Sequence, residues 1–491
     1  MLSNTLAHLG GRGLSAIVGF VVTTLVATQL GAAAMGVFGI YMVLQSLMGI
    51  LDGGMSTSIN RAIAIDAPKE QPQADSLRLF RTYELVLLGF ALIIFLSVST
   101  FMPWIVSQWE SESAKQLSSL ALAIFAGLAL ALRFFQTLYQ HVLFGAQHHK
   151  SANTVIGFFA AFRATCIMLV LFVFEGSLES VFVVLAISNG LEALTFLATC
   201  HAKKLWYFQT RPSWKRLKKT VSFMAPVSGA TIIALLLSQA DRIIIGHLVS
   251  LEQFGLYSLV ASYAFGINAL AYAPGNVFYP TITHALHNND KQAAAEAVTR
   301  TLNLILTLVF PVCLWAFFYG PAIGSIIFKD AATAIMTLPL WKPLFLACCL
   351  NVLTIIPFKI FLAQNRPDII FKINLIILFL YPLVFAGGIS VFGYEKGLFA
   401  LPALAGILFT SFLLCLQHRG ETEKLFAQKI IFKSTGLFVL LFLFYAATHV
   451  FITATPTSLI EQLLFAGWPL ALAGGITGWF LVLAPLKKRL A

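Results

Sequence analysis

The sequence has few charged residues and little length left over for a soluble domain. Only 11% of its 491 residues are charged and 59% are hydrophobic, whereas soluble proteins carry about 25% charged residues. A Gly-x-x-x-x-Gly-Lys-[Ser/Thr] motif is absent, so we expect no ATP use through a P-loop. The longest predicted outer loops, around 104–116 and 320–337, are also poor in carboxylates, so we expect neither an enzyme nor a cofactor.

Cysteine is scarce as well. The six cysteines all fall within or at the ends of apolar stretches, which excludes a disulfide framework and a zinc site. His141, His148 and His149 cluster in one polar segment without a nearby Cys, Asp or Glu, so we expect a solvated loop and no metal site. Residues 1–5 have no basic character and no small-residue cleavage site follows them, which predicts a retained first helix.

Long apolar stretches fill most of the chain. Each is about 20 residues long, enough to cross a ~30 Å hydrocarbon layer as a helix. We therefore predict an all-α, polytopic membrane protein with about 14 transmembrane helices. The predicted spans are 10–30, 37–60, 82–103, 117–140, 153–174, 180–200, 221–246, 255–280, 298–319, 338–362, 369–391, 397–416, 433–452 and 462–484.

The formal charge of +12 reports orientation rather than nucleic-acid binding. With the N-terminus in the cytoplasm, 24 of the 32 Lys and Arg fall on the cytoplasmic side and only Lys115, Lys329 and Lys396 on the other. The positive-inside rule predicts this asymmetry. We expect both termini in the cytoplasm, and the basic segment 201–220 to lie near anionic headgroups.

A weak internal repeat predicts two lobes. Residues 36–41 (GVFGIY) resemble residues 255–260 (GLYSLV), and an even number of spans separates them. Parallel repeats of this kind place a site between two halves. We predict a six-helix lobe at 1–220, a second at 221–416 and an appended helix pair at 417–491.

Proline and glycine interrupt several spans, mainly in the second predicted lobe. A proline inside a helix removes one backbone hydrogen bond and kinks the helix. We therefore expect the second lobe to be the more bent. The positions are Pro226, Pro274 with Gly275, Pro311, Pro357 and Pro382.

Ionisable residues inside the spans are the functional candidates, since each costs about 2.5–3.5 kcal/mol at mid-membrane unless it meets a partner or water. Arg163 and Glu192 reach the same depth across a tight hairpin, which predicts a pair. Asp52 and Arg133 both lie six to eight residues from the inner face, which predicts a second pair. Each pair is either a structural ion bridge or part of a cleft whose arginines hold phosphate.

Four other charges have simpler interpretations. Lys342 and Lys359 lie near span ends and are expected to extend to the interface. Asp241 and Arg242 are adjacent near the outer end of one span, where we expect them to order the following turn.

The chain resembles the polysaccharide transporters that flip lipid-linked O-antigen repeat units, a family of the multidrug, oligosaccharidyl-lipid and polysaccharide exporter superfamily. The layout matches along the whole chain, while the motifs are short. They are residues 10–16 (GGRGLSA), 30–31 (LG), 36–38 (GVF), 52–55 (DGGM), 60–61 (NR), 241–246 (DRIIIG) and 254–258 (FGLYS).

The resemblance implies alternating access around a central cavity in the bacterial inner membrane. The cargo it implies is an undecaprenyl-diphosphate-linked oligosaccharide flipped from the cytoplasmic to the periplasmic leaflet. We expect Arg163, Arg133 and Arg12 to contact its phosphates or acidic sugars. Asp52 and Glu192 are expected to balance these charges when the site is empty, or to couple transport to H+ or Na+.

Three alternatives remain open from the sequence. A flippase for the peptidoglycan precursor lipid II has a similar architecture. A cation-coupled multidrug exporter of the same superfamily would need an acidic cation site, which Asp52 and Glu192 allow, but the intramembrane arginines oppose cationic drugs. An enzyme that acts on lipid-linked glycans is the weakest alternative, because the large outer loop is missing.

Overall fold

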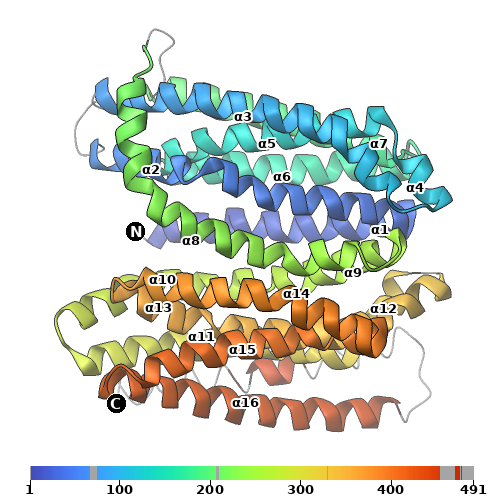
Figure 1. Ribbon diagram of the computed structural model, residues 1–491, viewed down its shortest axis with the longest axis vertical. Helices are drawn as coiled ribbons and strands as arrows, with labels where there is room; N and C mark the ends of the chain where they lie inside the picture. Colours follow the sequence, from blue (N-terminus) through green and yellow to red (C-terminus); the bar gives the residue numbers. More distant parts are fainter. Residues whose placement is uncertain are drawn as a thin grey trace. The chain divides into compact units, whose positions relative to one another are not determined.

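The computed structural model is built from α-helices (Figure 1). It describes residues 2–66, 74–205, 210–328, 330–453, 470–475 and 477. Within these ranges, side chains are described except at residues 2–17, 57, 65–66, 74–75, 216, 218–228, 230–231, 421 and 451–453. The described residues do not include Lys329 or most of the last predicted span, 462–484. For Arg12 the backbone is described but the side chain is not.

The described chain is all-α and polytopic, as predicted. Eleven of its segments are long and apolar enough to cross a membrane. The number is below fourteen partly because α1 contains the first two predicted spans, joined through Gly31 at a φ of 89°. The helices are α1 (Leu2–Asp52), α2 (Met55–Asp66), α3 (Ala74–Ser107), α4 (Glu112–Leu117), α5 (Leu120–Gly145), α6 (His149–Phe172), α7 (Leu178–Ala202), α8 (Trp214–Gly246), α9 (Leu251–Gly266), α10 (Asn268–His287), α11 (Lys291–Ile327), α12 (Ala331–Leu353), α13 (Ile355–Ala363), α14 (Pro367–Gly397), α15 (Ala400–Gln417) and α16 (Glu421–Thr453).

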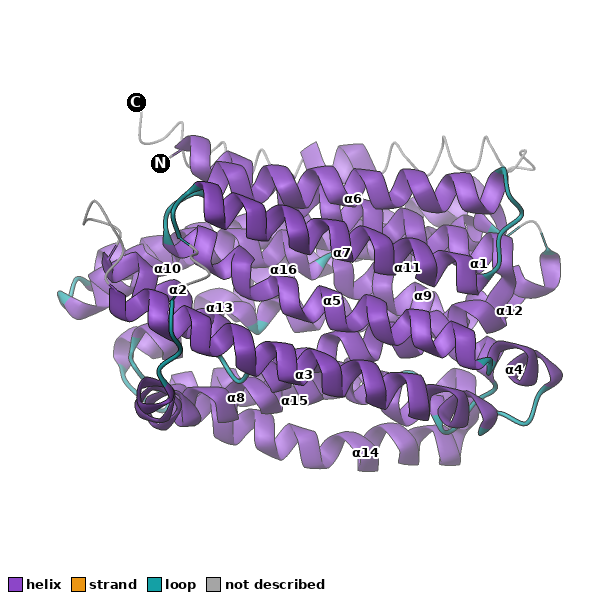
Figure 2. Ribbon diagram, turned by 90° about the horizontal axis from the view of Figure 1, so that it is seen from above, coloured by secondary structure: helices purple, strands orange, loops and turns teal. Residues whose placement is uncertain are grey.

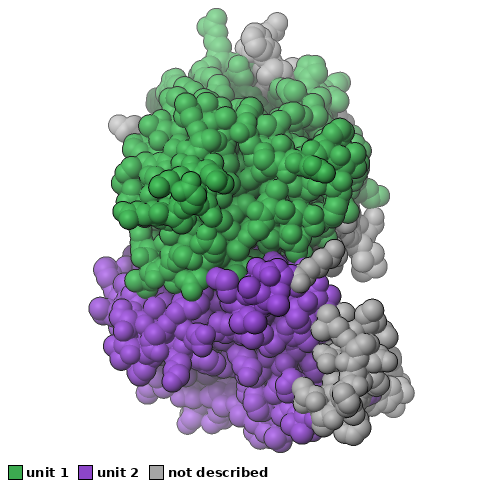
Figure 3. Space-filling model, turned by 90° about the vertical axis from the view of Figure 1, so that its right-hand side faces the viewer, with its two compact units in different colours: residues 1–259 green, residues 260–491 purple. Residues whose placement is uncertain are grey.

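The chain divides into two compact units, residues 1–259 and 260–491, coloured separately in Figure 3. The division falls inside α9, later than the predicted lobe boundary at residue 220. The reason is that α8 packs against α1 and α3 of the first unit. The first unit therefore contains the seventh predicted span as well as the first six.

In the first unit, α5 is the central helix. It packs on α3 and α7, and α6 packs on both α1 and α7. The long helices α3, α5, α6 and α7 run side by side (Figure 2). Short turns join α5 to α6 and α6 to α7, so consecutive helices are antiparallel neighbours and residues midway along them come to the same level.

Small residues let α1 and α9 touch backbone to backbone within this unit. A Cβ atom added at Gly255 would overlap the carbonyl group of Ala32, and one added at Gly36 would overlap Leu251. One added at Gly39 would lie 2.6 Å from the Ser258 hydroxyl oxygen. The two copies of the internal repeat thus meet each other, through the close glycine crossing that membrane helices use.

The second unit is more broken, as its prolines predicted. In it, α11 packs on α10, α12 and α16. The tenth predicted span divides at Thr354 into α12 and α13, and Pro357 lies in the first turn of α13, where its missing N–H costs little. The eighth span divides at Ile267, after Gly266, so Pro274 lies inside α10 rather than at the break. Pro311 and Pro382 lie within α11 and α14.

Candidate functional site

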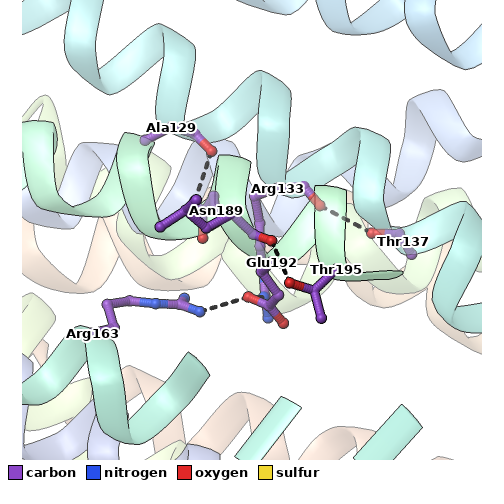
Figure 4. Close-up of polar contacts among 8 residues, drawn as sticks. Ala129, Arg133, Thr137, Arg163, Asn189, Glu192 and Thr195 are labelled. Carbon is purple, nitrogen blue, oxygen red and sulfur yellow. Dashed lines mark hydrogen bonds and ion pairs between the residues drawn. The ribbon is translucent and has the colours of Figure 1, made fainter. Parts of the chain in front are cut away.

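A single carboxylate binds two arginines near the middle of the first unit. Glu192 on α7 accepts a hydrogen bond from Arg163 on α6, with 2.8 Å between Nη2 and Oε2. Arg133 on α5 approaches the same oxygen, with its Nη1 at 3.3 Å. The side chains converge from three neighbouring helices (Figure 4). We call these three residues the arginine cluster.

The register of α7 on α5 fixes this geometry. The Asn189 amide, one turn before Glu192, donates to the carbonyl oxygen of Ala129 at 2.8 Å (Figure 4). Ala129 in turn lies one turn before Arg133. Because residues three or four apart share a helix face, this buried bond brings Glu192 and Arg133 to the same level.

The arginine cluster carries an excess positive charge. Glu192 is buried, with 1% of its side chain exposed, whereas the side chains of Arg163 and Arg133 are 17% and 34% exposed. Two guanidinium groups share one carboxylate, which leaves a formal charge of +1. The Arg163 Nε is buried and makes no hydrogen bond with a described residue. The arrangement can therefore accept an anion through hydrogen-bond donors that Glu192 does not use.

The structure confirms one predicted pair and corrects the other. Arg163 and Glu192 form the expected ion pair. The pairing of Arg133 with Asp52 was wrong, because Arg133 pairs with Glu192. The predicted span ended at residue 140, but α5 continues to Gly145, so Arg133 lies at mid-helix rather than near the inner face.

Asp52 has a local structural role. Its Oδ1 accepts hydrogen bonds from the Ser56 hydroxyl at 2.5 Å and the Ser56 amide at 3.2 Å. Asp52 thereby caps α2 after the chain turns through Gly53 and Gly54, both with positive φ. Arg12 lies in α1, but its side chain is outside the described part of the structure.

Sequence reasoning missed a second buried carboxylate in the first unit. Glu84 on α3 is 5% exposed, forms an ion pair with Arg81, and accepts a hydrogen bond from the Tyr139 hydroxyl at 2.5 Å. The predicted third span began at residue 82, which made Arg81 and Glu84 look like polar residues at a span end. Their i,i+3 spacing was the available signal.

The remaining charges divide between expected and unexpected positions. Lys342 is exposed, and Lys359 donates to Asn276 of α10 at 2.8 Å. Asp241 accepts a hydrogen bond from Tyr257 at 2.6 Å, which joins α8 to α9 across the turn it was expected to order. Arg242 donates to Gln239 at 3.3 Å.

The histidine loop and the cysteines show no metal-site geometry. Burial and the nearby Lys203 ammonium lower the pKa of His148 below its ordinary value. Within the described ranges, no group of three His, Cys, Asp or Glu side chains converges as metal ligands would. All six cysteines are free thiols.

The fold is similar to that of several solved membrane proteins. The structure of the lipid II flippase MurJ, in an inward closed conformation, aligns with 97% of this chain and all of its own with a TM-score of 0.67 and 13% identity. An inward-facing multidrug resistance MATE family transporter of the MOP superfamily aligns with 88% of this chain and 98% of its own, at a TM-score of 0.66 and 10% identity. A third structure is a MOP superfamily transporter from Pyrococcus furiosus, described as having a binding pocket of reverse polarity. It aligns with 87% of this chain and 95% of its own, at a TM-score of 0.55 and 13% identity.

The sequence itself identifies the family. Residues 1–286 match the family described as polysaccharide biosynthesis protein, which is more than half of the chain. The chain belongs to this family, and the predicted resemblance to polysaccharide transporters is confirmed at that level. A search of curated protein sequences finds no significant match.

Proposed function

We propose that this protein flips an undecaprenyl-diphosphate-linked oligosaccharide, such as an O-antigen repeat unit, from the cytoplasmic to the periplasmic leaflet of a bacterial inner membrane. The observation that carries the proposal is the arginine cluster, in which two guanidinium groups share one carboxylate inside a membrane-spanning bundle. A structural ion bridge needs one charge of each sign. A surplus arginine at this depth is costly, and its retention supports an anionic cargo.

The chemistry of the cluster suits a diphosphate. Planar guanidinium groups bind phosphate oxygens through two parallel hydrogen bonds. Glu192 accepts hydrogen bonds from both arginines through one oxygen, Oε2. A diphosphate that approaches Arg133, the more exposed of the two, would compete with Glu192 for these donors. Glu192 thus stabilises the empty site, and cargo replaces it as the partner.

Other parts of the proposal follow from the topology. Arg12 is proposed to meet the phosphates first, near the cytoplasmic end of α1. Asp52 and Glu192 are the carboxylates at which H+ or Na+ coupling is proposed. The protein is proposed to work by alternating access between two six-helix lobes, 1–220 and 221–416, with an appended helix pair at 417–491. Both termini are proposed to lie in the cytoplasm.

The second candidate function is flipping of lipid II. The observation that favours it is the alignment over the full length of the lipid II flippase structure. Both cargoes present a diphosphate on a polyprenyl tail, so the arginine cluster suits both. A cationic drug is a poorer ligand, because the cluster already has an excess positive charge.

A deletion strain tests the proposal. Removing the protein should cause lipid-linked repeat units to accumulate in the cytoplasmic leaflet, and mass spectrometry of the extracted lipids should identify them. Arg133→Ala and Arg163→Ala proteins should restore less than about a tenth of surface polysaccharide, since a lost charged hydrogen bond is worth ~1.5–3 kcal/mol.

Arg300→Ala is the matched control. Arg300 forms an exposed i,i+4 ion pair with Glu296 in α11 and should be dispensable. Normal surface polysaccharide with both cluster variants at wild-type membrane levels would reject the assignment of the cluster. Accumulation of lipid II in place of repeat units would favour the second candidate.

A further inference from the structure

Lys359 is a cation in the second unit without an acidic partner among the described residues. Its Nζ donates to the Asn276 side-chain oxygen at 2.8 Å and lies 5.3 Å from the centre of the Tyr279 ring. The Phe358 ring centre is 5.8 Å away. An ammonium held only by an amide and aromatic faces keeps its full positive charge available to an anion.

The side chain of Lys359 reaches the neighbouring helix α10, where its ammonium meets Asn276. Helical side chains lean toward the N-terminus of their helix, so Lys359 leans away from Ala363, the end of α13, and toward α10. A Cβ atom added at Gly275 of α10 would lie 3.8 Å from Lys359 Cε, an ordinary van der Waals contact. The stem of Lys359 therefore passes beside Gly275 and reaches Asn276 one residue further along α10.

The residues around the ammonium form a stripe on α10. Tyr272, Asn276 and Tyr279 are spaced i, i+4 and i+7, so they share one helix face. Tyr272 is 49% exposed and Asn276 is also exposed, although both lie in the membrane-spanning segment Leu251–His287. An exposed amide beside a half-buried ammonium at membrane depth faces a water-filled space or a ligand rather than lipid.

We propose that Lys359 and the Tyr272–Asn276–Tyr279 stripe bind a carboxylate-bearing sugar in the glycan head of the cargo. Lys359 supplies one positive charge for one carboxylate, Asn276 bonds a ring hydroxyl, and the tyrosine rings stack against the apolar face of a pyranose. A diphosphate is better served by the paired guanidinium groups of the arginine cluster. The inference rests on the proposed function in assuming a glycan cargo, and it adds that the glycan is acidic.

Binding of soluble glycans tests this inference without the lipid. The probes are a tetrasaccharide of alternating glucuronic acid and N-acetylglucosamine, and its carboxyl-reduced, neutral form. The full-length protein in detergent should bind the acidic probe about tenfold more tightly by microscale thermophoresis, the effect of one charge-assisted hydrogen bond. Lys359→Gln should lower the affinity for the acidic probe to that for the neutral one, and Lys359→Arg should retain most of the difference.

Lys433→Gln is the matched control. Lys433 is another half-buried lysine of the second unit, held by the side-chain oxygen of Asn303 at 2.9 Å. It should leave the preference for the acidic probe unchanged. Equal or undetectable binding of the two probes by the wild-type protein, or an equal loss in both lysine variants, would overturn the inference.

The result is separable from the proposed function. An Arg163→Gln protein should still prefer the acidic probe, since Arg163 lies in the first unit and Lys359 in the second. A normal preference for the acidic probe, together with no accumulation of lipid-linked glycan in the deletion strain, would reject the flippase proposal alone. The reverse combination would reject the sugar site alone.

Discussion

Replacing Glu192 and replacing one of its two arginines should have different effects on stability and on anion binding. A buried ion pair that loses one partner leaves an uncompensated charge, which costs about 3–5 kcal/mol. Removing Arg133 leaves Arg163 and Glu192 as a neutral pair with a 2.8 Å hydrogen bond. Removing Glu192 leaves two guanidinium groups facing each other. Stability therefore depends mainly on Glu192, whereas anion binding depends on the arginines.

This asymmetry predicts opposite outcomes for two neutralising substitutions. Glu192→Gln should lower the free energy of unfolding by about 3–5 kcal/mol, seen as a lower thermal midpoint and a lower folded yield in detergent. Arg133→Gln should leave both close to wild type and still fail to restore surface polysaccharide. If Arg133→Gln were the less stable protein, the charge assignment of the cluster would be wrong.

At this scale the sequence predicts partners only where helix ends are known. The Arg163–Glu192 pair could be predicted because a short hairpin fixes the relative depth of α6 and α7. The partner of Arg133 could not, because the apolar pattern is interrupted at His141 while the helix continues to Gly145. An error of five residues shifts a side chain by about 7.5 Å along a helix, enough to change its partner.

At the scale of helices, the crossing of α1 with α9 depends on glycine. There is little hydrophobic driving force between helices in lipid, so close packing of small residues supplies the association energy. Gly36 and Gly255 come from the two copies of the repeat. Gly255 packs against the backbone of Ala32 and Gly36, and Gly36 packs against the backbone and side chain of Leu251. The glycines of the repeat are therefore explained by packing.

Adding one methyl group at this crossing should separate the helices. Gly255→Ala would overlap the Ala32 carbonyl and should lower the free energy of unfolding by about 1–3 kcal/mol. Gly89→Ala makes the same chemical change in α3, where nothing lies within 4 Å. It should be neutral or stabilise by up to about 1 kcal/mol. Equal thermal midpoints for the two variants would show that the crossing is looser than described.

Breaks between helices were only partly predictable. Pro357 marked the division between α12 and α13 because proline favours the first turn of a helix. Pro274 marked the right span but the wrong position, since a membrane helix can continue through a proline when neighbours satisfy the freed carbonyl. The cap that Asp52 provides for α2 was hidden by the assumption that a carboxylate in a span must be paired with a cation.

For the whole molecule, the charge distribution predicts the orientation, and the division into units follows from packing. The basic linker marked residue 220 as a boundary because it separates the two predicted six-helix lobes. Packing places α8 with the first unit, so the division falls after Leu259. A sequence repeat predicts how many helices each half contains, but it does not predict which neighbours each helix packs against.

The predicted orientation can be checked with single cysteines in a protein whose six native cysteines are replaced. Lys203→Cys should react with a membrane-impermeant maleimide only after the inner membrane is permeabilised. Lys115→Cys should react in intact spheroplasts, because it lies on the opposite side. Labelling of both positions before permeabilisation would contradict the assigned topology.

The shared carboxylate also has a consequence for the order of synthesis. Arg133 precedes Glu192 by 59 residues and Arg163 precedes it by 29. At about 5–20 residues per second, Arg133 waits roughly 3–12 s before its counter-charge is made. Each unpaired arginine opposes insertion by about 2.5–3.5 kcal/mol. Pairing with Glu192 removes this cost once α7 is made, so the shared carboxylate favours insertion of α5, α6 and α7 as a group.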